Sequence, residues 1–165
     1  MSSPQSRLPW SMAIPWWGFD KLASEFTLIR QVEFHETDTA GMVHFSNFFR
    51  YMEAAEHAFF RSLGFSIHGG DVGWPRVHAD CDYRAPLRFE DKFEIRLLVR
   101  ERRERSICYS FQFRKLNAGS PVEVARGALT VACVRFDEAG KLSSVPIPAE
   151  IASQIEAASP ELLAQ

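Results

Sequence analysis

The densest group of polar side chains is the segment HETDTAGMVHFSNF, residues 35–48, which lies just before a long apolar stretch with helical spacing. Its best-placed carboxylate is Asp38, three residues before Gly41. A helix N-terminus has unpaired backbone N–H groups and a partial positive charge, so it can hold an oxyanion or a polarised carbonyl oxygen. A carboxylate nearby can act as a nucleophile or as a general base. The pattern indicates acyl-transfer chemistry, and the alternative is that Asp38 only caps a turn.

The elements around this segment follow from apolar periodicity. Alternating apolar residues in 26–35 predict a strand before it. Apolar residues at three- and four-residue spacing predict a long helix after it, with Ser46 or Asn47 as the N-cap and Gly64 as the end. This helix is apolar around much of its surface, so we expect a sheet to wrap around it.

Further strands are predicted in 77–83, 93–99, 107–113 and 122–136, and a last helix in 149–158. The short connections between the later strands require antiparallel hairpins, because parallel pairing needs long crossovers. The predicted fold class is therefore α+β, in one domain over residues 26–165. Residues 1–25, rich in Trp and Pro, are interpreted as an N-terminal extension.

Three stretches carry a resemblance to a known family. They are VEFHETDTAGMVHFSNFFRYMEAAE (residues 32–56), DYRAPLRFEDKFEIRLLV (82–99) and GKLSSVPIPAEI (140–151). Together they resemble the 4-hydroxybenzoyl-CoA thioesterase family of the hotdog fold, whose pattern is Thr/Cys-Asp-x-x-Gly followed by Asn-Tyr/Phe near the start of a central helix. The resemblance covers roughly residues 26 to 152.

The resemblance implies a central helix wrapped by an antiparallel sheet, and a homodimer with continuous sheets and two sites at the subunit interface. Dimers of this fold often pair into homotetramers. The implied reaction is hydrolysis of an acyl-CoA to a carboxylic acid and free CoA, with CoA as part of the substrate and no metal or redox cofactor. Asp38 falls on the catalytic aspartate, which acts as a nucleophile through a mixed anhydride or as a general base. The Phe45 backbone N–H would polarise the thioester carbonyl, and Gly41 would keep the approach open.

Further positions are expected near the substrate on the same grounds: His44, Asn47, Gly73, Trp74, Arg103 and Arg105. Many relatives have Tyr or His where Phe45 stands, whereas the imidazole here is one position earlier. Asn47 is interpreted as an N-cap or loop-fixing residue. Gly73 would border the acyl pocket from the partner subunit, with Trp74 as a pocket wall or a core residue. The two arginines would contact the CoA phosphates, unless they are solvated turn residues.

Composition narrows the class of protein. The chain has 165 residues and a formal net charge of -2, so no global positive field indicates nucleic acid or an anionic membrane as a partner. No apolar run approaches the roughly 18 residues of a membrane span. The three cysteines lack metal-ligand spacing and are expected as buried thiols in a reducing compartment, so we expect a cytoplasmic protein.

Two other functions share these features. One is hydrolysis of acyl groups carried by an acyl carrier protein, whose phosphopantetheine arm presents the same thioester without the adenosine phosphates. The other is a non-catalytic hotdog module that binds acyl-CoA. The acyl group itself is not defined by the sequence.

Overall fold

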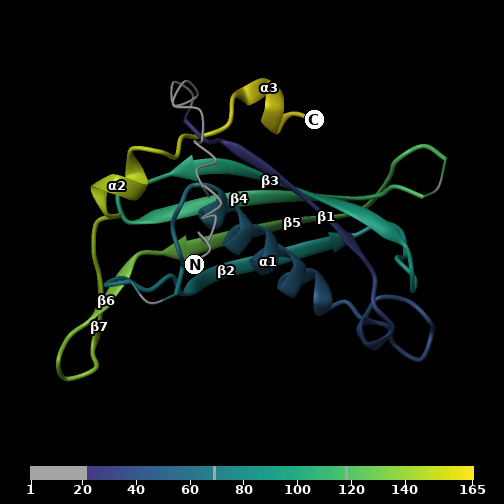
Figure 1. The fold of residues 1–165 in the computed structure, drawn as a ribbon, viewed down its shortest axis with the longest axis horizontal. Coiled ribbons are helices and arrows are strands. Elements are labelled where there is room, and N and C mark those ends of the chain that lie inside the picture. The colour runs from purple at the N-terminus through teal and green to yellow at the C-terminus, as the bar shows by residue number, and fades with distance from the viewer. Residues whose placement is uncertain (1–21, 69, 118) are drawn as a thin grey trace, which may run out of the picture.

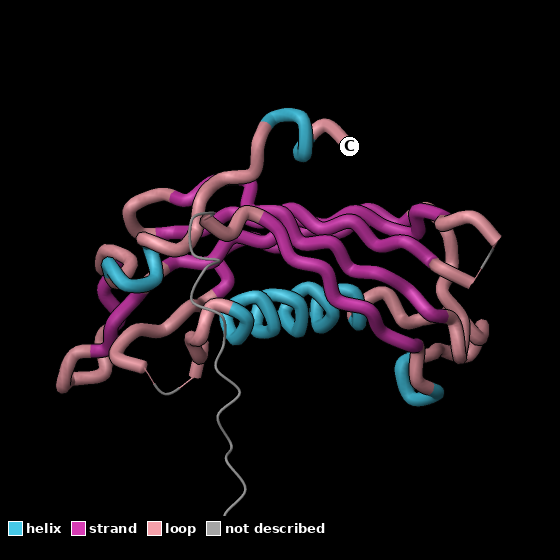
Figure 2. The backbone as a smooth tube through the Cα atoms, turned by 45° about the horizontal axis from the view of Figure 1, so that its top comes forward, coloured by secondary structure: helices cyan, strands magenta, loops and turns pink. Residues whose placement is uncertain are grey.

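The computed structural model describes residues 22–68, 70–117 and 119–165, so the predicted N-terminal extension lies almost entirely outside the described residues. Five antiparallel strands form the main sheet, in the order β1-β3-β4-β5-β2. They are β1 (Glu25–Gln31), β2 (Arg76–Tyr83), β3 (Lys92–Arg102), β4 (Ser106–Lys115) and β5 (Val122–Ala132). Helix α1 (Asn47–Ser62) runs along one face of this sheet (Figures 1 and 2). The predicted α+β architecture is confirmed.

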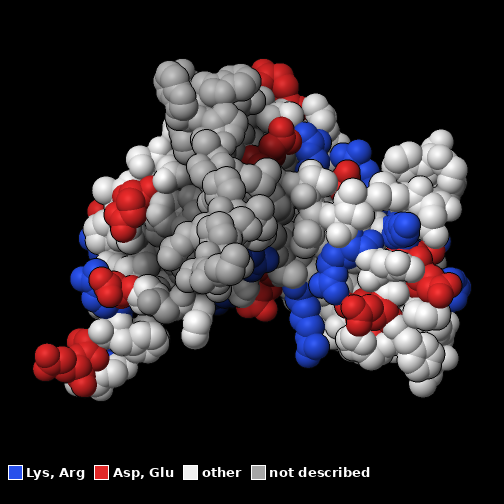
Figure 3. Space-filling model, viewed as in Figure 1, with Lys and Arg blue, Asp and Glu red and all other residues white. Residues whose placement is uncertain are grey.

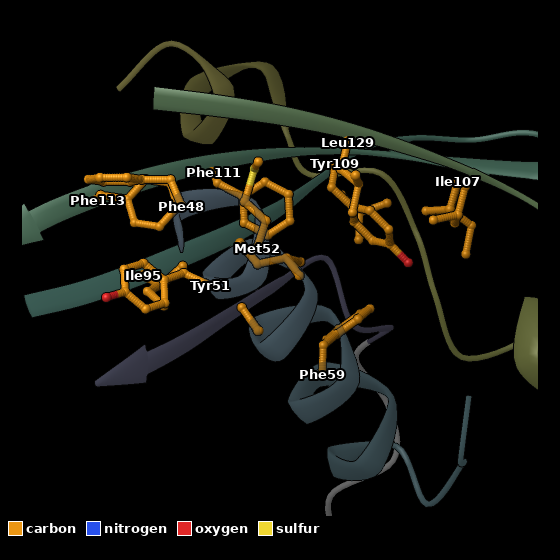
Figure 4. Packing of buried hydrophobic residues seen from close by; sticks show 14 of the residues in the cluster. Phe48, Tyr51, Met52, Phe59, Ile95, Ile107, Tyr109, Phe111, Phe113 and Leu129 are labelled. Carbon is orange, nitrogen blue, oxygen red and sulfur yellow. The ribbon is translucent and has the colours of Figure 1, made fainter. Parts of the chain in front are cut away.

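Helix α1 is held by the apolar face that its sequence period predicts. Phe48, Met52 and Phe59 are almost fully buried and point toward side chains of the sheet (Figure 4). Gly127 in β5 allows the close approach of the helix, because a Cβ atom there would lie 2.5 Å from the Met52 sulfur. The sheet therefore depends on a missing side chain at this position to seat the helix.

One charged residue lies inside this core. Glu56 of α1 has no exposed surface, and its Oε2 accepts a hydrogen bond from Arg76 at 2.5 Å. Its Oε1 has no partner among the described residues, and neither has the buried hydroxyl of Tyr109. Burial raises the pKa of Glu56 to about 7, against the opposing effect of Arg76. The ion pair joins α1 to the first residue of β2.

Three predicted elements differ from the structure. The predicted strand 122–136 is divided at Cys133 into β5 and β6 (Val134–Phe136), and β6 pairs with β7 (Leu142–Ser144) in a separate two-stranded sheet. The division occurs because the backbone of Cys133 turns to bond Arg105 and Val145. Hydrophobic alternation continues through the break, so the sequence pattern does not reveal it.

The other two differences concern the ends of elements. The first strand stops at Gln31, and a 3-10 helix, η1 (Phe34–Glu36), follows because the Glu36 side chain accepts the Glu33 N–H at 2.8 Å. The predicted helix 149–158 is only the single turn α2 (Ala149–Ala152), and a second turn, α3 (Pro160–Leu163), follows after a bend.

Charges of both signs are mixed on the surface. The face in Figure 3 shows Lys and Arg interspersed with Asp and Glu, which agrees with the small net charge. Within the described ranges, no helix is both long enough and apolar enough to span a membrane.

Candidate active site

The candidate site is built on the turn that follows η1. Asp38 Oδ1 accepts the backbone N–H of Ala40 at 2.8 Å and that of Met42 at 3.3 Å. Gly41 closes the turn with φ of 70°, a conformation that favours glycine. Asp38 therefore does cap a turn with one oxygen. Its Oδ2 has no hydrogen-bond or ion-pair partner within the described part of the chain and is free for chemistry.

The same turn occurs a second time in the molecule. Asp137 Oδ1 accepts the N–H groups of Ala139 at 3.0 Å and Lys141 at 2.8 Å, and Gly140 has φ of 77°. This second turn joins β6 to β7 and does not line the cavity that opens beside Asp38, which is described below. Local geometry is therefore shared by Asp38 and Asp137, and the surroundings distinguish them.

Glu36 fixes the loop that carries Asp38. Its backbone carbonyl accepts the N–H of His44 at 2.9 Å and the side-chain amide of Asn47 at 2.7 Å. Its buried carboxylate also contacts Arg30 at 3.3 Å. The role of Glu36 could not be predicted from the sequence, because only the folded loop brings these partners together. Asn47, expected near the substrate or as a loop-fixing residue, fixes the loop.

A cavity of about 380 Å³ opens beside Asp38. Most of its wall is apolar, and its lining residues are Asp38, Met42, Val43, Phe45, Phe48, Tyr83, Arg84, Ala85, Pro86 and Leu87. The segment 84–87, which follows β2, is attached to the Asp38 loop by a hydrogen bond from the Val43 N–H to the Leu87 carbonyl at 2.8 Å. An apolar cavity with one free carboxylate oxygen is suited to an apolar substrate group that reacts at that oxygen.

Phe45 lies on the wall of the same cavity, two residues before α1. Its backbone N–H donates no hydrogen bond within the described residues, whereas its carbonyl accepts the Phe48 N–H at 3.3 Å and the Tyr83 hydroxyl at 3.1 Å. A free N–H at the start of a helix can stabilise a developing oxyanion. The structure thus brings the Asp38 carboxylate and the predicted oxyanion donor to one cavity.

Gly41 and His44 have local contacts outside this cavity wall. The Gly41 carbonyl lies 3.4 Å from Arg88 Nη1, and a Cβ on Gly41 would point toward that guanidinium at 3.6 Å. His44 is exposed, and its Nδ1 lies 2.8 Å from the Ser46 hydroxyl. Neither residue lines the cavity beside Asp38. Gly41 is required by the backbone conformation of the turn.

Gly73 and Trp74 lie at the other end of β2 within the same chain. Tyr83 lies nine positions after Trp74, which corresponds to about 30 Å of extended chain. Trp74 is 5% exposed and packs against Phe60, so it belongs to the core. Gly73 pairs with Val134 of β6.

Arg103 and Arg105 are also remote from Asp38, because the whole length of β3 lies between them. Arg103 donates to Glu101 at 2.8 Å, and Arg105 donates to the Ser144 carbonyl at 2.9 Å. A single chain therefore does not bring these arginines to the Asp38 cavity. Across the three described ranges, no group of three or more His, Cys, Asp or Glu side chains is arranged to hold a metal ion.

The chain is similar in sequence to a family of thioesterase-like proteins. Residues 32–155 match the family model described as the thioesterase-like superfamily. A protein of Aquifex aeolicus (strain VF5) named "Putative esterase" is 37% identical over 124 residues, which cover 73% of this chain and 91% of that protein.

Two further relatives have named substrates. The 4-hydroxybenzoyl-CoA thioesterase of Pseudomonas sp. (strain CBS-3) is 23% identical over 135 residues, covering 78% of this chain and 96% of that enzyme. A solved gentisyl-coenzyme A thioesterase structure superposes with a TM-score of 0.68 at 31% identity, covering 77% of this chain and 99% of that one.

Proposed function

The chain belongs to the thioesterase-like superfamily, as the sequence resemblance predicts, and we propose that it hydrolyses the thioester of an acyl-CoA to a carboxylic acid and free CoA. Two of its relatives are named as thioesterases of aromatic acyl-CoAs. The observation that carries the proposal is that Asp38 and Phe45 line the same apolar cavity. There, within the described residues, one oxygen of the Asp38 carboxylate and the Phe45 N–H have no hydrogen-bond partner.

Asp38 is the proposed reactive carboxylate. The two N–H groups that hold Oδ1 fix its orientation and leave Oδ2 to act on water or on the thioester carbon. Attack on that carbon, by the activated water or by Oδ2, forms a tetrahedral intermediate, and its collapse breaks the carbon–sulfur bond and releases CoA as the thiolate. In the Oδ2 route, water then cleaves the anhydride between Asp38 and the acyl group to give the carboxylic acid. The Phe45 N–H would stabilise the oxyanion of that intermediate. CoA enters as part of the substrate, and the proposed steps use no metal or redox cofactor.

Thiol release from a panel of aromatic and straight-chain acyl-CoAs tests the proposal. We expect Asp38→Asn to lower kcat at least about 100-fold, because the positioned carboxylate supplies the catalysis. Asp137→Asn is the matched control, since it alters an identical turn outside the cavity and should keep wild-type activity. No turnover of any acyl-CoA by the folded wild-type protein would refute the proposal, and carrier-protein thioesters would then be tested.

The two roles of Asp38 are separable. Repeated turnover in ¹⁸O-labelled water would place label in the Asp38 carboxylate only if a mixed anhydride forms, because that route exposes the Asp38 carbonyl carbon to water. Product labelling with an unlabelled Asp38 excludes attack of water on an Asp38 anhydride carbonyl and is the result expected of the general-base route. Mass spectrometry of the peptide that contains residue 38 gives the answer.

We also propose a homodimer through the free edge of β2. In the described residues, β2 pairs only with β5. Val77 and Tyr83 on this strand are 62% and 47% exposed, and unprotected edge strands are prone to pair with another chain. A two-fold antiparallel pairing would place the start of the partner's β2, with Gly73 next to it, beside the Asp38 cavity, as the resemblance implies for Gly73.

Light scattering on the intact protein tests this assembly. Val77→Lys places a charge on the exposed edge strand and should shift the protein toward monomer, whereas Ile29→Lys on the opposite edge strand should not. A monomeric wild-type protein would refute the dimer, and a larger species would indicate the tetramer.

The three cysteines are unpaired thiols, which supports the cytoplasm as the place of reaction.

A further inference from the structure

Tyr83 occupies an unusual position in the site. It is the last residue of β2, one of the two edge strands of the main sheet, and it lies on the cavity wall with Asp38. The ring packs edge-on against Phe48, with centroids 5.2 Å apart and planes at 75°. This contact with a buried residue of the first turn of α1 fixes the direction of the Tyr83 hydroxyl.

The Tyr83 hydroxyl donates a hydrogen bond to a backbone atom of the site, and the Cys81 thiol lies near it. It donates to the carbonyl of Phe45 at 3.1 Å, across 38 positions of sequence. Partial burial and the nearby Cys81 thiol raise the pKa of Tyr83 to about 12, so the hydroxyl stays protonated and remains a donor at neutral pH. The accepting carbonyl belongs to Phe45, and the N–H of Phe45 donates no hydrogen bond within the described residues.

The side chain of Phe45 contributes little to fixing the Phe45 backbone, so other residues must position it. Its ring is 59% exposed, and its nearest aromatic contact is the exposed ring of His44, 4.5 Å away. The backbone of Phe45 is therefore positioned by two hydrogen bonds to its carbonyl, one from Phe48 and one from Tyr83. Of these, the bond from Tyr83 is the one that ties Phe45 to the sheet.

We propose that Tyr83 is a positioning residue that holds the Phe45 N–H in place for the oxyanion, acting through its hydroxyl. This inference rests on the proposed thioesterase function. An N–H group stabilises the tetrahedral intermediate only if it is held at hydrogen-bond distance from the oxygen on which charge develops. That charge is absent in the bound substrate, so a looser Phe45 lowers kcat and leaves substrate binding nearly unchanged.

Tyr83→Phe removes the hydroxyl and keeps the ring against Phe48. We expect kcat for the acyl-CoA that the wild type hydrolyses best to fall about 5- to 30-fold, less than the roughly 100-fold or more that loss of an oxyanion donor costs. KM should stay within about twofold of wild type. Tyr109→Phe is the matched control, because it removes a buried hydroxyl without a partner from the same sheet and should keep wild-type kinetics.

A second measurement separates positioning from general stability. The ¹⁵N chemical shift and hydrogen exchange of the Phe45 amide should change in Tyr83→Phe and stay unchanged in Tyr109→Phe. Binding of the acyl-CoA to Asp38→Asn should be the same with and without Tyr83→Phe. Wild-type kcat in Tyr83→Phe, or a loss carried by KM or by weaker binding, would overturn the inference. If the wild type releases no thiol, the proposed function fails, while the Phe45 amide signals still report on the hydrogen bond.

Discussion

The side-chain amide of Asn47 donates a hydrogen bond of 2.7 Å to the backbone carbonyl of Glu36, which joins the first residue of α1 to the segment just before Asp38. The same oxygen accepts the His44 N–H at 2.9 Å. The loop from Glu36 to Asn47 is thus closed by two hydrogen bonds to one oxygen atom, the carbonyl oxygen of Glu36. Because Asp38 lies inside this closed loop and Phe45 lies at its end, the separation of the two groups is set by the folded loop.

Asn47→Ala should weaken both stability and catalysis. Loss of one half-buried hydrogen bond should lower the free energy of unfolding by about 1 kcal/mol. The loosened loop should lower kcat about tenfold, since small displacements of reacting groups are costly. Urea denaturation and thiol release measure the two effects. Ser46→Ala is the control, because Ser46 makes no side-chain bond to the helix and its contact with His44 is exposed. Equal effects of both substitutions would contradict the role of Asn47.

Gly127→Ala tests the seating of α1. The new Cβ would lie 2.5 Å from the Met52 sulfur and 3.2 Å from the Asp80 carbonyl, so the Met52 side chain, the helix or the strand must shift. We expect the free energy of unfolding to fall by about 1 to 3 kcal/mol. Gly70→Ala, where no atom lies within 4 Å, should change it by less than about 0.5 kcal/mol. A neutral Gly127→Ala would show that Met52 repacks without cost.

The raised pKa of Glu56 predicts that the stability of the protein depends on pH. The folded pKa of about 7 exceeds the ordinary value of 4.5, so the folded state binds the proton more tightly than the unfolded chain does. The stability that this carboxyl contributes is complete below about pH 4.5, is lost as pH rises toward 7, and is constant above that. Glu56→Gln does not titrate. Its free energy of unfolding relative to wild type should therefore improve from pH 4.5 to 7.5, by roughly 1 kcal/mol or more. The same difference at every pH would contradict this assignment.

Arg103 and Arg105 remain predicted contacts of the CoA phosphates, and a dimer is needed to bring them to the cavity. We expect Arg103→Ala/Arg105→Ala to raise KM for acyl-CoA about tenfold with little change in kcat, because charge-assisted bonds to phosphate are lost. The matching acyl-pantetheine, which has no adenosine phosphates, should be hydrolysed equally by both proteins. An unchanged KM for acyl-CoA would leave the arginines to their pairs with Glu101 and Ser144.

The elements near the site could be predicted because their signals are local. The spacing of apolar residues predicts α1 between Ser46 and Gly64, and the structure places it at Asn47–Ser62. The ends of the strands are harder to predict from the sequence. Cys133 interrupts the last long strand through bonds to Arg105 and Val145, which no periodicity records. Helical spacing after Pro148 likewise continues beyond the point where the chain bends.

The sequence by itself determined the fold class, the family and the pairing of Asp38 with the start of α1, because all three depend on residues close together in the chain. Local pattern could not decide whether Asp38 is more than a turn cap, since Asp137 forms the same turn. Only the tertiary structure distinguishes the two turns, by placing Tyr83 and residues 84–87 against the Asp38 turn to form the cavity. The physical reason is that burial and hydrogen bonds between segments some 40 residues apart arise when the sheet closes over the helix, and the spacing of residues along the chain does not record them.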